Sequence, residues 1–404
     1  MKALLPKIKF KNFDEKWNRK KLHSIAPLRG GFAFKSEKFQ NTGIPIVRIS
    51  NIKFDGTVGG EFEYYSKINS DEKFVLRGRS ILLAMSGATT GKIAMLDSEE
   101  EYYQNQRVGY FQNTGEVDYD FLSSVLQTKA FTNQLNAVLV AGAQPNISSK
   151  EIDSFEFYIP DSIDEQSVIG SLFHTLDDLL ASYKDNLANY QVLKATMLSK
   201  MFPKAGQTVP EIRLDGFEGE WEVVNLGTLI ENYDEIISGV SGFPIATSSR
   251  KGLYLQNDYF EGGRTGIDLT LDFHRVPMGY VTYRHMSDDS IFKFNKNNFE
   301  TDVLVSKEYP VFMSNDSSNI DFILYHLNNS RLFLRFSTMQ KLGGTRVRLY
   351  YKNLITYKLA VPTIKEQQAI GSYFSNLDNL INSQQEKISQ LETLKKKLFQ
   401  DMFV

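Results

Sequence analysis

The sequence predicts an α+β protein built as a pseudo-two-fold tandem repeat, in which two β-rich mixed α/β domains are each followed by one long helix. Three observations predict this fold class. The 404-residue chain repeats itself at a fixed offset. The segments that repeat best carry the heptad spacing of long helices. The remainder consists of short strand-like runs separated by glycine and polar turns.

The repeat is clearest around two Glu-Gln pairs. Glu165-Gln166 begins a pattern that starts again 201 positions later at Glu366-Gln367, and the register holds without a gap to Met201-Phe202 and Met402-Phe403. A fainter match joins the openings of the two halves, including the only two tryptophans, Trp17 and Trp221. The chain is therefore expected to contain two copies of one plan.

Each copy ends in a segment of helical periodicity. About 38 residues at about 1.5 Å each make a helix about 57 Å long, which is more than one domain needs to cover its core. An amphipathic helix lying on its own domain is the simpler alternative, but this length favours two helices that project and pair as an antiparallel coiled coil. The expected seam is Ile169, Phe173, Leu176, Leu180 and Leu187 in the first helix, and Ile370, Phe374, Leu377, Ile381, Ile388, Leu391 and Leu398 in the second.

The pattern also sets domain boundaries. We expect globular domains at 1–160 and 206–361 and helical regions at 161–205 and 362–404. Strand-like runs lie at 44–50, 80–85, 92–96, 107–112 and 155–159, and in the second half at 280–284, 302–306 and 346–351. Helical patterns at 121–138 and 321–337 interrupt the two domains at similar places.

The amino-acid composition excludes several classes of function. The absence of cysteine excludes disulfide frameworks, thiolate nucleophiles and cysteine-based zinc sites. No signal-like segment and no run of about 18 apolar residues occurs, so a cytoplasmic protein without a membrane role is expected. The net charge of -2 does not indicate a general nucleic-acid binder, but the segment Arg331–Lys352 holds six basic residues and no acidic one, as a local binding face would.

Short segments in both halves carry side chains suited to DNA. Gly87–Lys92 has three residues between its glycines and Ile93 after its lysine, so it fails the phosphate-loop motif and is interpreted as a tight turn facing DNA phosphates. Gln104–Arg107 is suited to base edges, although a polar edge strand explains it equally well. The candidates for DNA binding are Lys35, Thr89, Thr90, Lys92, Gln104, Gln106, Arg107, Gln144, Asn146, Arg250, Lys251, Arg284, His285, Arg331, Arg335, Arg346 and Arg348.

Sites for catalysis are missing. None of the five histidines has the spacing of a metal motif such as His-Glu-x-x-His, so no metal site is expected. The chain contains no Pro-Pro, and therefore not the Asn/Asp-Pro-Pro-aromatic motif of DNA amino-methyltransferases. Gln166 stands where a nuclease would need a lysine. We therefore assign no catalytic residue.

Taken together, these features resemble the DNA specificity subunit of type I restriction-modification enzymes. The resemblance spans essentially the full length and rests on the Pro-x(n)-Glu-Gln-x-x-Ile openings of both helices, on Ser80–Gly87 with Gly91–Ala94, and on Asn105–Val108. It implies two target-recognition domains, each followed by a conserved helix. The two domains would read a bipartite, asymmetric double-stranded DNA site in the major groove, as part of defence against foreign DNA. The second half lacks the Gly-Lys turn and the Asn-Gln-Arg element, so we expect the domains to read different half-sites.

The resemblance also implies partners. It predicts two modification subunits that carry S-adenosylmethionine and two restriction subunits that use ATP and Mg, with no cofactor in this chain itself. Two alternatives remain: a catalytic methyltransferase or nuclease polypeptide, which a methylation assay on the isolated chain would reveal, and a coiled-coil adaptor without a DNA role, which gel shifts with bipartite DNA would separate.

Overall fold

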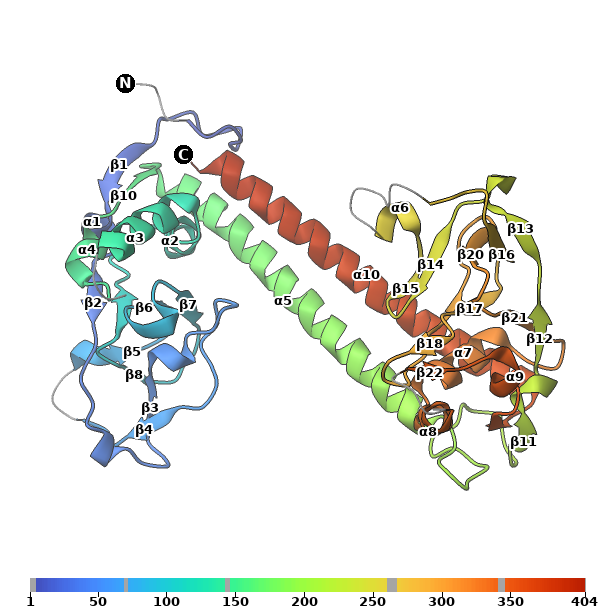
Figure 1. Cartoon of the computed structure of the whole chain (residues 1–404). Coiled ribbons are helices and arrows are strands. Elements are labelled where there is room, and N and C mark those ends of the chain that lie inside the picture. The colour runs from blue at the N-terminus through green and yellow to red at the C-terminus, as the bar shows by residue number, and fades with distance from the viewer. Residues whose placement is uncertain (1–4, 69–71, 142–145, 260–266, 341–345, 404) are drawn as a thin grey trace. The chain divides into compact units, whose positions relative to one another are not determined.

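The computed structural model describes residues 5–68, 72–141, 146–259, 267–340 and 346–403, which belong to two compact units (Figure 1). Unit 1 joins residues 1–184 to 386–404, and unit 2 comprises residues 185–385. The two long helices, α5 (Ile163–Lys200) and α10 (Ile364–Met402), therefore each contribute to both units. Within the described ranges, no helix is long and apolar enough to span a bilayer.

The described strands of unit 1 form three small sheets. Their orders are β2-β9-β6-β7, β4-β3-β8-β5 and β1-β10, and the pairing of β3 with β8 is parallel whereas the others are antiparallel. The strands are β1 (Asn18–Lys21), β2 (Leu28–Gly30), β3 (Ile44–Val47), β4 (Glu63–Tyr65), β5 (Val75–Leu76), β6 (Ser80–Ala84), β7 (Ile93–Leu96), β8 (Tyr102–Gln104), β9 (Val108–Phe111) and β10 (Glu156–Ile159).

Strand β6 is the centre of unit 1. All five of its residues are buried, which explains the unbroken apolar run in its sequence, because a strand covered on both faces does not alternate. Ile81 and Leu83 point into the core that also holds Phe173 of α5. Leu82 and Ala84 point into a second core on the opposite face. Loops that leave this strand are therefore held by packing on both sides.

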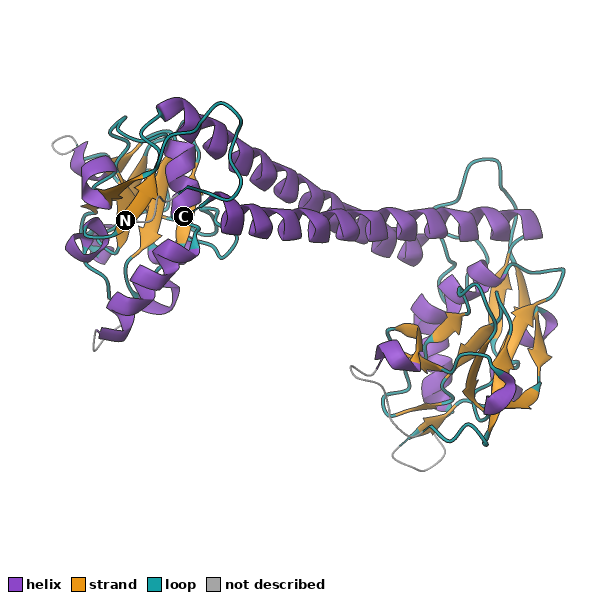
Figure 2. Ribbon diagram, turned by 90° about the horizontal axis from the view of Figure 1, so that it is seen from above, coloured by secondary structure: helices purple, strands orange, loops and turns teal. Residues whose placement is uncertain are grey.

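Unit 2 has a different set of sheets, in which strands and short helices again intermix (Figure 2). The orders are β12-β21-β17-β19, β13-β16-β20, β14-β15, β18-β22 and β11-β23. The strands are β11 (Glu222–Asn225), β12 (Ile230–Tyr233), β13 (Ile236–Ser238), β14 (Ala246–Ser249), β15 (Gly252–Leu255), β16 (Asp272–Val276), β17 (Val281–Tyr283), β18 (Met286–Ser287), β19 (Phe294–Lys296), β20 (Val303–Ser306), β21 (Val311–Ser314), β22 (Val347–Arg348) and β23 (Lys358–Val361).

The helices expected within the domains are each broken in two. The pattern at 121–138 becomes α2 (Tyr119–Val125) and α3 (Lys129–Ala141), and the pattern at 321–337 becomes α7 (Ile320–Asn329) and α8 (Arg331–Met339). Ser330 causes the second break, because its backbone is extended and its hydroxyl accepts hydrogen bonds from the next helix's amides. The strand expected at 346–351 is also shorter, since α9 (Tyr351–Leu354) begins there. The remaining short helices are α1 (Leu22–Ile25), α4 (Ser149–Asp153) and α6 (Gln256–Tyr259).

The helical regions expected at 161–205 and 362–404 contain α5 and α10, and these two helices pair within each unit. In unit 1 the rings of Phe173 and Phe399 stack with centroids 4.3 Å apart, and Lys395 forms an ion pair with Asp177. In unit 2 the equivalent residues, Lys194 and Asp378, form the same ion pair. From Lys395 to Phe399 the partner moves back from Asp177 to Phe173 in unit 1, and from Lys194 to Phe202 it moves back from Asp378 to Phe374 in unit 2. The paired segments therefore run antiparallel.

Burial along the expected seam varies. The positions at the start of each helix are buried, whereas those further along are half-buried. The buried residues are Ile169, Phe173, Leu176, Leu180, Ile370, Phe374, Leu377 and Ile381, and the half-buried ones are Leu187, Ile388, Leu391 and Leu398.

The glutamine of each Glu-Gln pair ties a long helix to its domain. The Gln166 carbonyl accepts a hydrogen bond of 2.8 Å from the Asp118 amide, and its amide group donates to the Pro160 carbonyl at 2.8 Å. Asp118 is itself the N-cap of α2. In unit 2, Gln367 makes the equivalent bonds to Asn319, the N-cap of α7, and to the Pro362 carbonyl. The repeated letters therefore encode one docking contact made twice.

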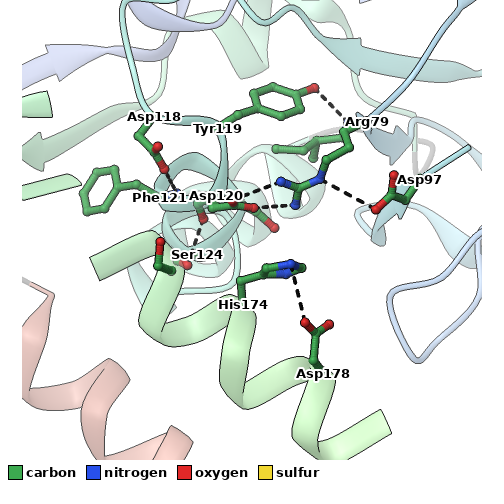
Figure 3. A network of polar contacts seen from close by, with 12 residues as sticks. Arg79, Asp97, Asp118, Tyr119, Asp120, Phe121, Ser124, His174 and Asp178 are labelled. Atoms are coloured by element: carbon green, nitrogen blue, oxygen red, sulfur yellow. Dashed lines mark hydrogen bonds and ion pairs between the residues drawn. The ribbon is translucent and has the colours of Figure 1, made fainter. Parts of the chain in front are cut away.

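A basic side chain completes the same junction. In unit 1, the Arg79 guanidinium forms a bidentate ion pair with Asp120 and lies 3.8 Å from Asp97 (Figure 3). These partners raise the pKa of Arg79. In unit 2, Lys296 pairs with Asp321 at 2.8 Å, 201 positions after Asp120. The docking contact is thus a helix N-cap plus a charge pair in both units.

Gly170 lies where α5 crosses the start of α2, and it permits close approach. A Cβ atom at Gly170 would lie 2.4 Å from the Phe121 backbone nitrogen, and one at Gly371 would lie 2.7 Å from the Asn319 side chain oxygen. We expect Gly170→Val to lower the free energy of unfolding by about 1–3 kcal/mol through overpacking, and Gly371→Val to do likewise.

Thermal unfolding of the full chain measures both effects. The control is Ala188→Val at an exposed position of α5, which should change the stability by no more than about 0.5 kcal/mol. Equal melting temperatures for Gly170→Val and the control would show that the helix does not dock through this crossing.

Candidate nucleic-acid interface

Three loops of unit 1 meet at the end of β6. The Ala84 amide donates to the Lys92 carbonyl, the Met85 amide donates to the Arg107 carbonyl, and the Ile147 amide donates to the Met85 carbonyl, each at 2.9 Å. These bonds bring together segments that are far apart in sequence, namely the Gly87–Lys92 turn, the 105–107 turn and the segment at 146–147. We call this surface the β6-end loops.

The threonine hydroxyls of the Gly87–Lys92 turn are hydrogen-bonded within the protein. Thr90 donates to the Gly87 carbonyl at 2.6 Å, and Thr89 donates to the Ile49 carbonyl at 3.3 Å. Gly87 and Gly91 have φ values of +80° and +86°, a region that favours glycine. The Thr90 hydroxyl therefore stabilises the turn itself, and the Thr89 hydroxyl ties the turn to the segment at Ile49.

Lys92 does not extend into solvent. Its ammonium group lies over the ring of Phe54, and no hydrogen-bond acceptor reaches it from the described part of the chain. Loss of water lowers the pKa of Lys92. Phe54 is not among the candidate residues predicted from the sequence. The sequence does contain a sign of its exposure, since Phe54 directly precedes Asp55-Gly56. This pair favours a turn, and a turn exposes the side chains at its tip.

Gln104 was expected to reach bases, and its position contradicts that expectation. It is completely buried. Its carbonyl accepts two bonds of 3.2 Å from the Arg29 guanidinium, and its amide group donates to the carbonyls of Arg29 and Val108 at 2.8 and 2.7 Å. With every polar atom of the side chain bonded, Gln104 joins β8 to β2 and β9 and has no group left for DNA.

The other candidates of unit 1 lie at the surface. Gln106 and Arg107 are exposed at the turn after Gln104, beside Phe32, whose carbonyl accepts a hydrogen bond from the Gln106 amide. Lys35 is exposed in the loop that follows β2, and Asn146 is exposed at the edge of the β6-end loops. Gln144 lies outside the described residues.

The candidates of unit 2 gather around the short pair of β18 and β22. Arg348 of β22 is exposed and pairs in register with Met286 of β18, and Arg284 is exposed just before β18. His285 is different, because it is buried and stacks on Tyr350 with ring centroids 5.5 Å apart. Desolvation lowers the pKa of His285. We therefore assign His285 to the core rather than to the DNA-facing set.

Two of the arginines have acidic partners that the sequence pattern concealed. Arg346 donates to Asp288 at 2.9 Å, and Arg250 donates to Asp289 at 2.8 Å. The segment 331–352 contains no acidic residue, but Asp288 reaches Arg346 from the loop after β18, and Asp289 of the same loop reaches Arg250. Arg346 and Arg250 are thus neutralised in this conformation, while Lys251 is exposed at the turn between β14 and β15.

Helix α8 carries Arg331 and Arg335 on one exposed face, since residues four apart are neighbours on a helix. Its other face buries Phe333 and Ser337. The Ser337 hydroxyl donates to the Ser290 carbonyl at 2.8 Å, which fixes α8 beside the loop that carries Asp288 and Asp289. Ser290 has a φ of 66°, so the loop is held in a strained conformation at this point. The described residues show no ion pair at Arg331 or Arg335.

The described residues contain no group of three His, Asp or Glu side chains that could hold a metal ion. The comparison that decides the family is a match of residues 14–213 and 255–393 to the type I restriction modification DNA specificity domain. These ranges include most of the chain. The chain belongs to the type I restriction-modification DNA specificity family. As a specificity protein it serves DNA recognition and is not a catalytic polypeptide.

Named relatives agree with this family. The specificity chain is 23% identical over 419 aligned positions to the putative type I restriction enzyme MjaX specificity subunit of Methanocaldococcus jannaschii, covering 95% of this chain and 92% of that protein. It is 26% identical over 173 residues to the MjaVIII specificity subunit of the same organism, a match that covers 41% of this chain and 40% of the relative.

A solved structure shows the same fold. The crystal structure of the type I restriction-modification system S subunit from M. genitalium superposes with a TM-score of 0.60 over 99% of both chains, at 14% sequence identity. This confirms the predicted fold class, two α/β domains with two long helices.

Proposed function

We propose that this specificity chain reads a bipartite DNA site through two unlike surfaces, one on each unit. In each unit the domain that carries the surface docks on its long helix through equivalent contacts, which we call the docking frame. The observation that carries the proposal is the contrast between frame and surface. The frame uses Gln166 and Gly170 in unit 1 and their equivalents Gln367 and Gly371 in unit 2. The surfaces share no such equivalence, since unit 1 offers the β6-end loops and unit 2 offers α8 beside β18 and β22.

The chemistry of each surface suits DNA in its own way. In unit 1, exposed Gln106 and Arg107 have the side-chain types that form bidentate hydrogen bonds to base edges. In unit 2, α8 presents Arg331 and Arg335 on one face, and a helix of this diameter fits the major groove. Phosphate contacts from neighbouring cations of unit 2, such as Arg348 and Lys251, would position the unit 2 reader.

The long helices offer equivalent apolar positions for partners. Leu179 and Leu193 of α5 are 42% and 36% exposed, and their counterparts 201 positions later, Leu380 and Leu394 of α10, are 42% and 45% exposed. The same apolar surface presented twice suits two copies of one partner. We assign it to two modification subunits that carry S-adenosylmethionine, joined in the complete enzyme by two restriction subunits that use ATP and Mg.

Substitution of Arg331 and Arg335 by Gln tests the reader of unit 2. If they contact bases, each change should weaken binding by about 1–3 kcal/mol and relax one position of the target. If they contact phosphates, the slope of log affinity against log salt should fall by about one for each. Binding titrations with duplexes of varied sequence at several salt concentrations measure both.

The control for this test is Lys358→Gln, which removes an exposed cation of unit 2 from β23. It should leave affinity and specificity unchanged. A double arginine variant that binds every duplex as the unmodified chain does would exclude α8 as a DNA reader.

A further inference from the structure

Phe54 is a large apolar side chain that is exposed to solvent. It lies at the tip of the turn between Ile52 and Val58 and is 90% exposed, although other large aromatic rings of unit 1 such as Phe111 and Phe121 are fully buried. Burial of a phenyl ring is favourable, so the exposed ring forgoes a stabilisation of the free protein.

The turn that carries Phe54 is firmly built. The Lys53 amide donates to the Thr57 carbonyl at 3.0 Å, and the Asp55 carboxylate accepts bonds from the Thr57 amide and hydroxyl at 3.0 and 2.7 Å. These bonds lower the pKa of Asp55. The Gly56 carbonyl accepts a bond from the Met95 amide of β7. The ring is therefore presented from a fixed position beside the central sheet.

The neighbour of Phe54 is a cation without a hydrogen-bond acceptor in the described chain. The Lys92 ammonium group lies over the Phe54 ring and is shielded from water. The ring face attracts this cation electrostatically but offers it no hydrogen-bond acceptor. Lys92 also belongs to the β6-end loops through the bond between its carbonyl and the Ala84 amide. The pair thus adjoins the proposed reading surface.

These features call for a partner that offers both negative charge and flat apolar faces. Double-stranded DNA offers phosphates and bases within one nucleotide. A folded protein partner would more often cover an exposed phenyl ring with an apolar pocket than with a charge. Charge complementarity at Lys92 therefore favours nucleic acid as the occupant.

We propose that Phe54 is a base-stacking residue of unit 1, which enters a base step of the target while the Lys92 ammonium group leaves the ring for an adjacent phosphate. The proposal rests on the proposed function, since it assumes that unit 1 reads DNA, and it names the residue that stacks. Apolar wedges of this kind unstack one base step and bend the duplex, so specificity would depend on how easily that step opens.

The test uses the full chain assembled with its host modification subunits. The probe is a duplex carrying the target mapped by methylation-sensitive sequencing, with 2-aminopurine placed at each position of the unit 1 half-site in turn. Fluorescence of 2-aminopurine rises when its neighbours unstack. With the unmodified chain, we expect a rise confined to one base step.

Variants at two positions separate the ring from the charge. Phe54→Ala should lose the fluorescence rise and weaken binding roughly 5- to 150-fold, whereas Phe54→Trp should keep both. Lys92→Gln should keep the rise and reduce the salt slope by about one. Val140→Ala is the matched control, because Val140 is 87% exposed on α3 of the same unit, and it should change neither quantity.

Three outcomes would overturn the proposal. Phe54→Ala could bind as tightly as the unmodified chain, or it could lose affinity although no position of the unmodified complex shows unstacking, which would indicate an edge contact such as a thymine methyl group. It could also fail to assemble with the modification subunits in the absence of DNA, which would make Phe54 a protein contact. Failure of the proposed function looks different, because the unmodified complex would then bind the target duplex no better than unrelated DNA.

Discussion

A heptad inserted into both long helices, at the level of Ala188 in α5 and Gln384 in α10, is expected to redirect recognition to DNA sites with a spacer longer by about three base pairs. Seven residues lengthen a helix by about 10 Å, and a base pair occupies about 3.4 Å of the duplex. A whole heptad also keeps the seam in phase. The two positions match because Lys194 pairs with Asp378 in the antiparallel segment of unit 2, which sets residue 188 opposite residue 384.

Insertion into α5 alone serves as the control. Each unit contains paired segments of both helices, tied by Lys395 to Asp177 and by Lys194 to Asp378, so one lengthened helix opposes one of native length. The single insertion should therefore abolish specific binding rather than shift the spacer. Titrations across duplexes of graded spacer length distinguish these results. A doubly inserted chain that keeps the native spacer preference would show that the helices do not measure the site.

Exchange of residues 1 to about 155 for the equivalent domain of another specificity chain is expected to change one half-site and leave the other intact. The exchange replaces the β6-end loops but keeps Gln166, Gly170 and the whole of unit 2. Affinity for the old half-site should fall toward nonspecific binding, a loss of about 10³-fold or more. Selection of bound duplexes from a randomised library reports both half-sites at once. If both change together, the two units do not read independently.

Local periodicity made the long helices predictable, because heptad spacing is a property of neighbouring residues. The repeat at 201 positions also revealed which residues matter at the junction. It did not reveal what they do, since the partners of Gln166 lie 48 residues before it, at Asp118, and six residues before it, at Pro160. Only the folded chain shows that the glutamine bonds the start of another helix.

The candidate surface was less predictable, because exposure depends on contacts distant in sequence. Gln104 and Gln106 are the same residue type two positions apart, yet Gln104 is buried and bonded to Arg29 whereas Gln106 is exposed. Arg346 lies in a segment free of acids, yet Asp288 reaches it from 58 residues away. Phe54 could not be predicted as a surface residue from its type, because large apolar residues usually lie in a core and only the fold of its turn exposes this one. Residue type alone indicated the chemistry but not the availability of each side chain.

The central claim is that the two units dock on the long helices through equivalent contacts but read DNA through different surfaces. Methylation-sensitive sequencing of host DNA tests this claim most directly. The comparison is between cells that carry the chain with its modification partners and cells from which this chain alone is deleted. We predict one methylated motif that depends on the chain and consists of two different half-sites separated by unspecified bases. A chain-dependent motif that is continuous or palindromic, or methylation that persists unchanged without the chain, would contradict the account.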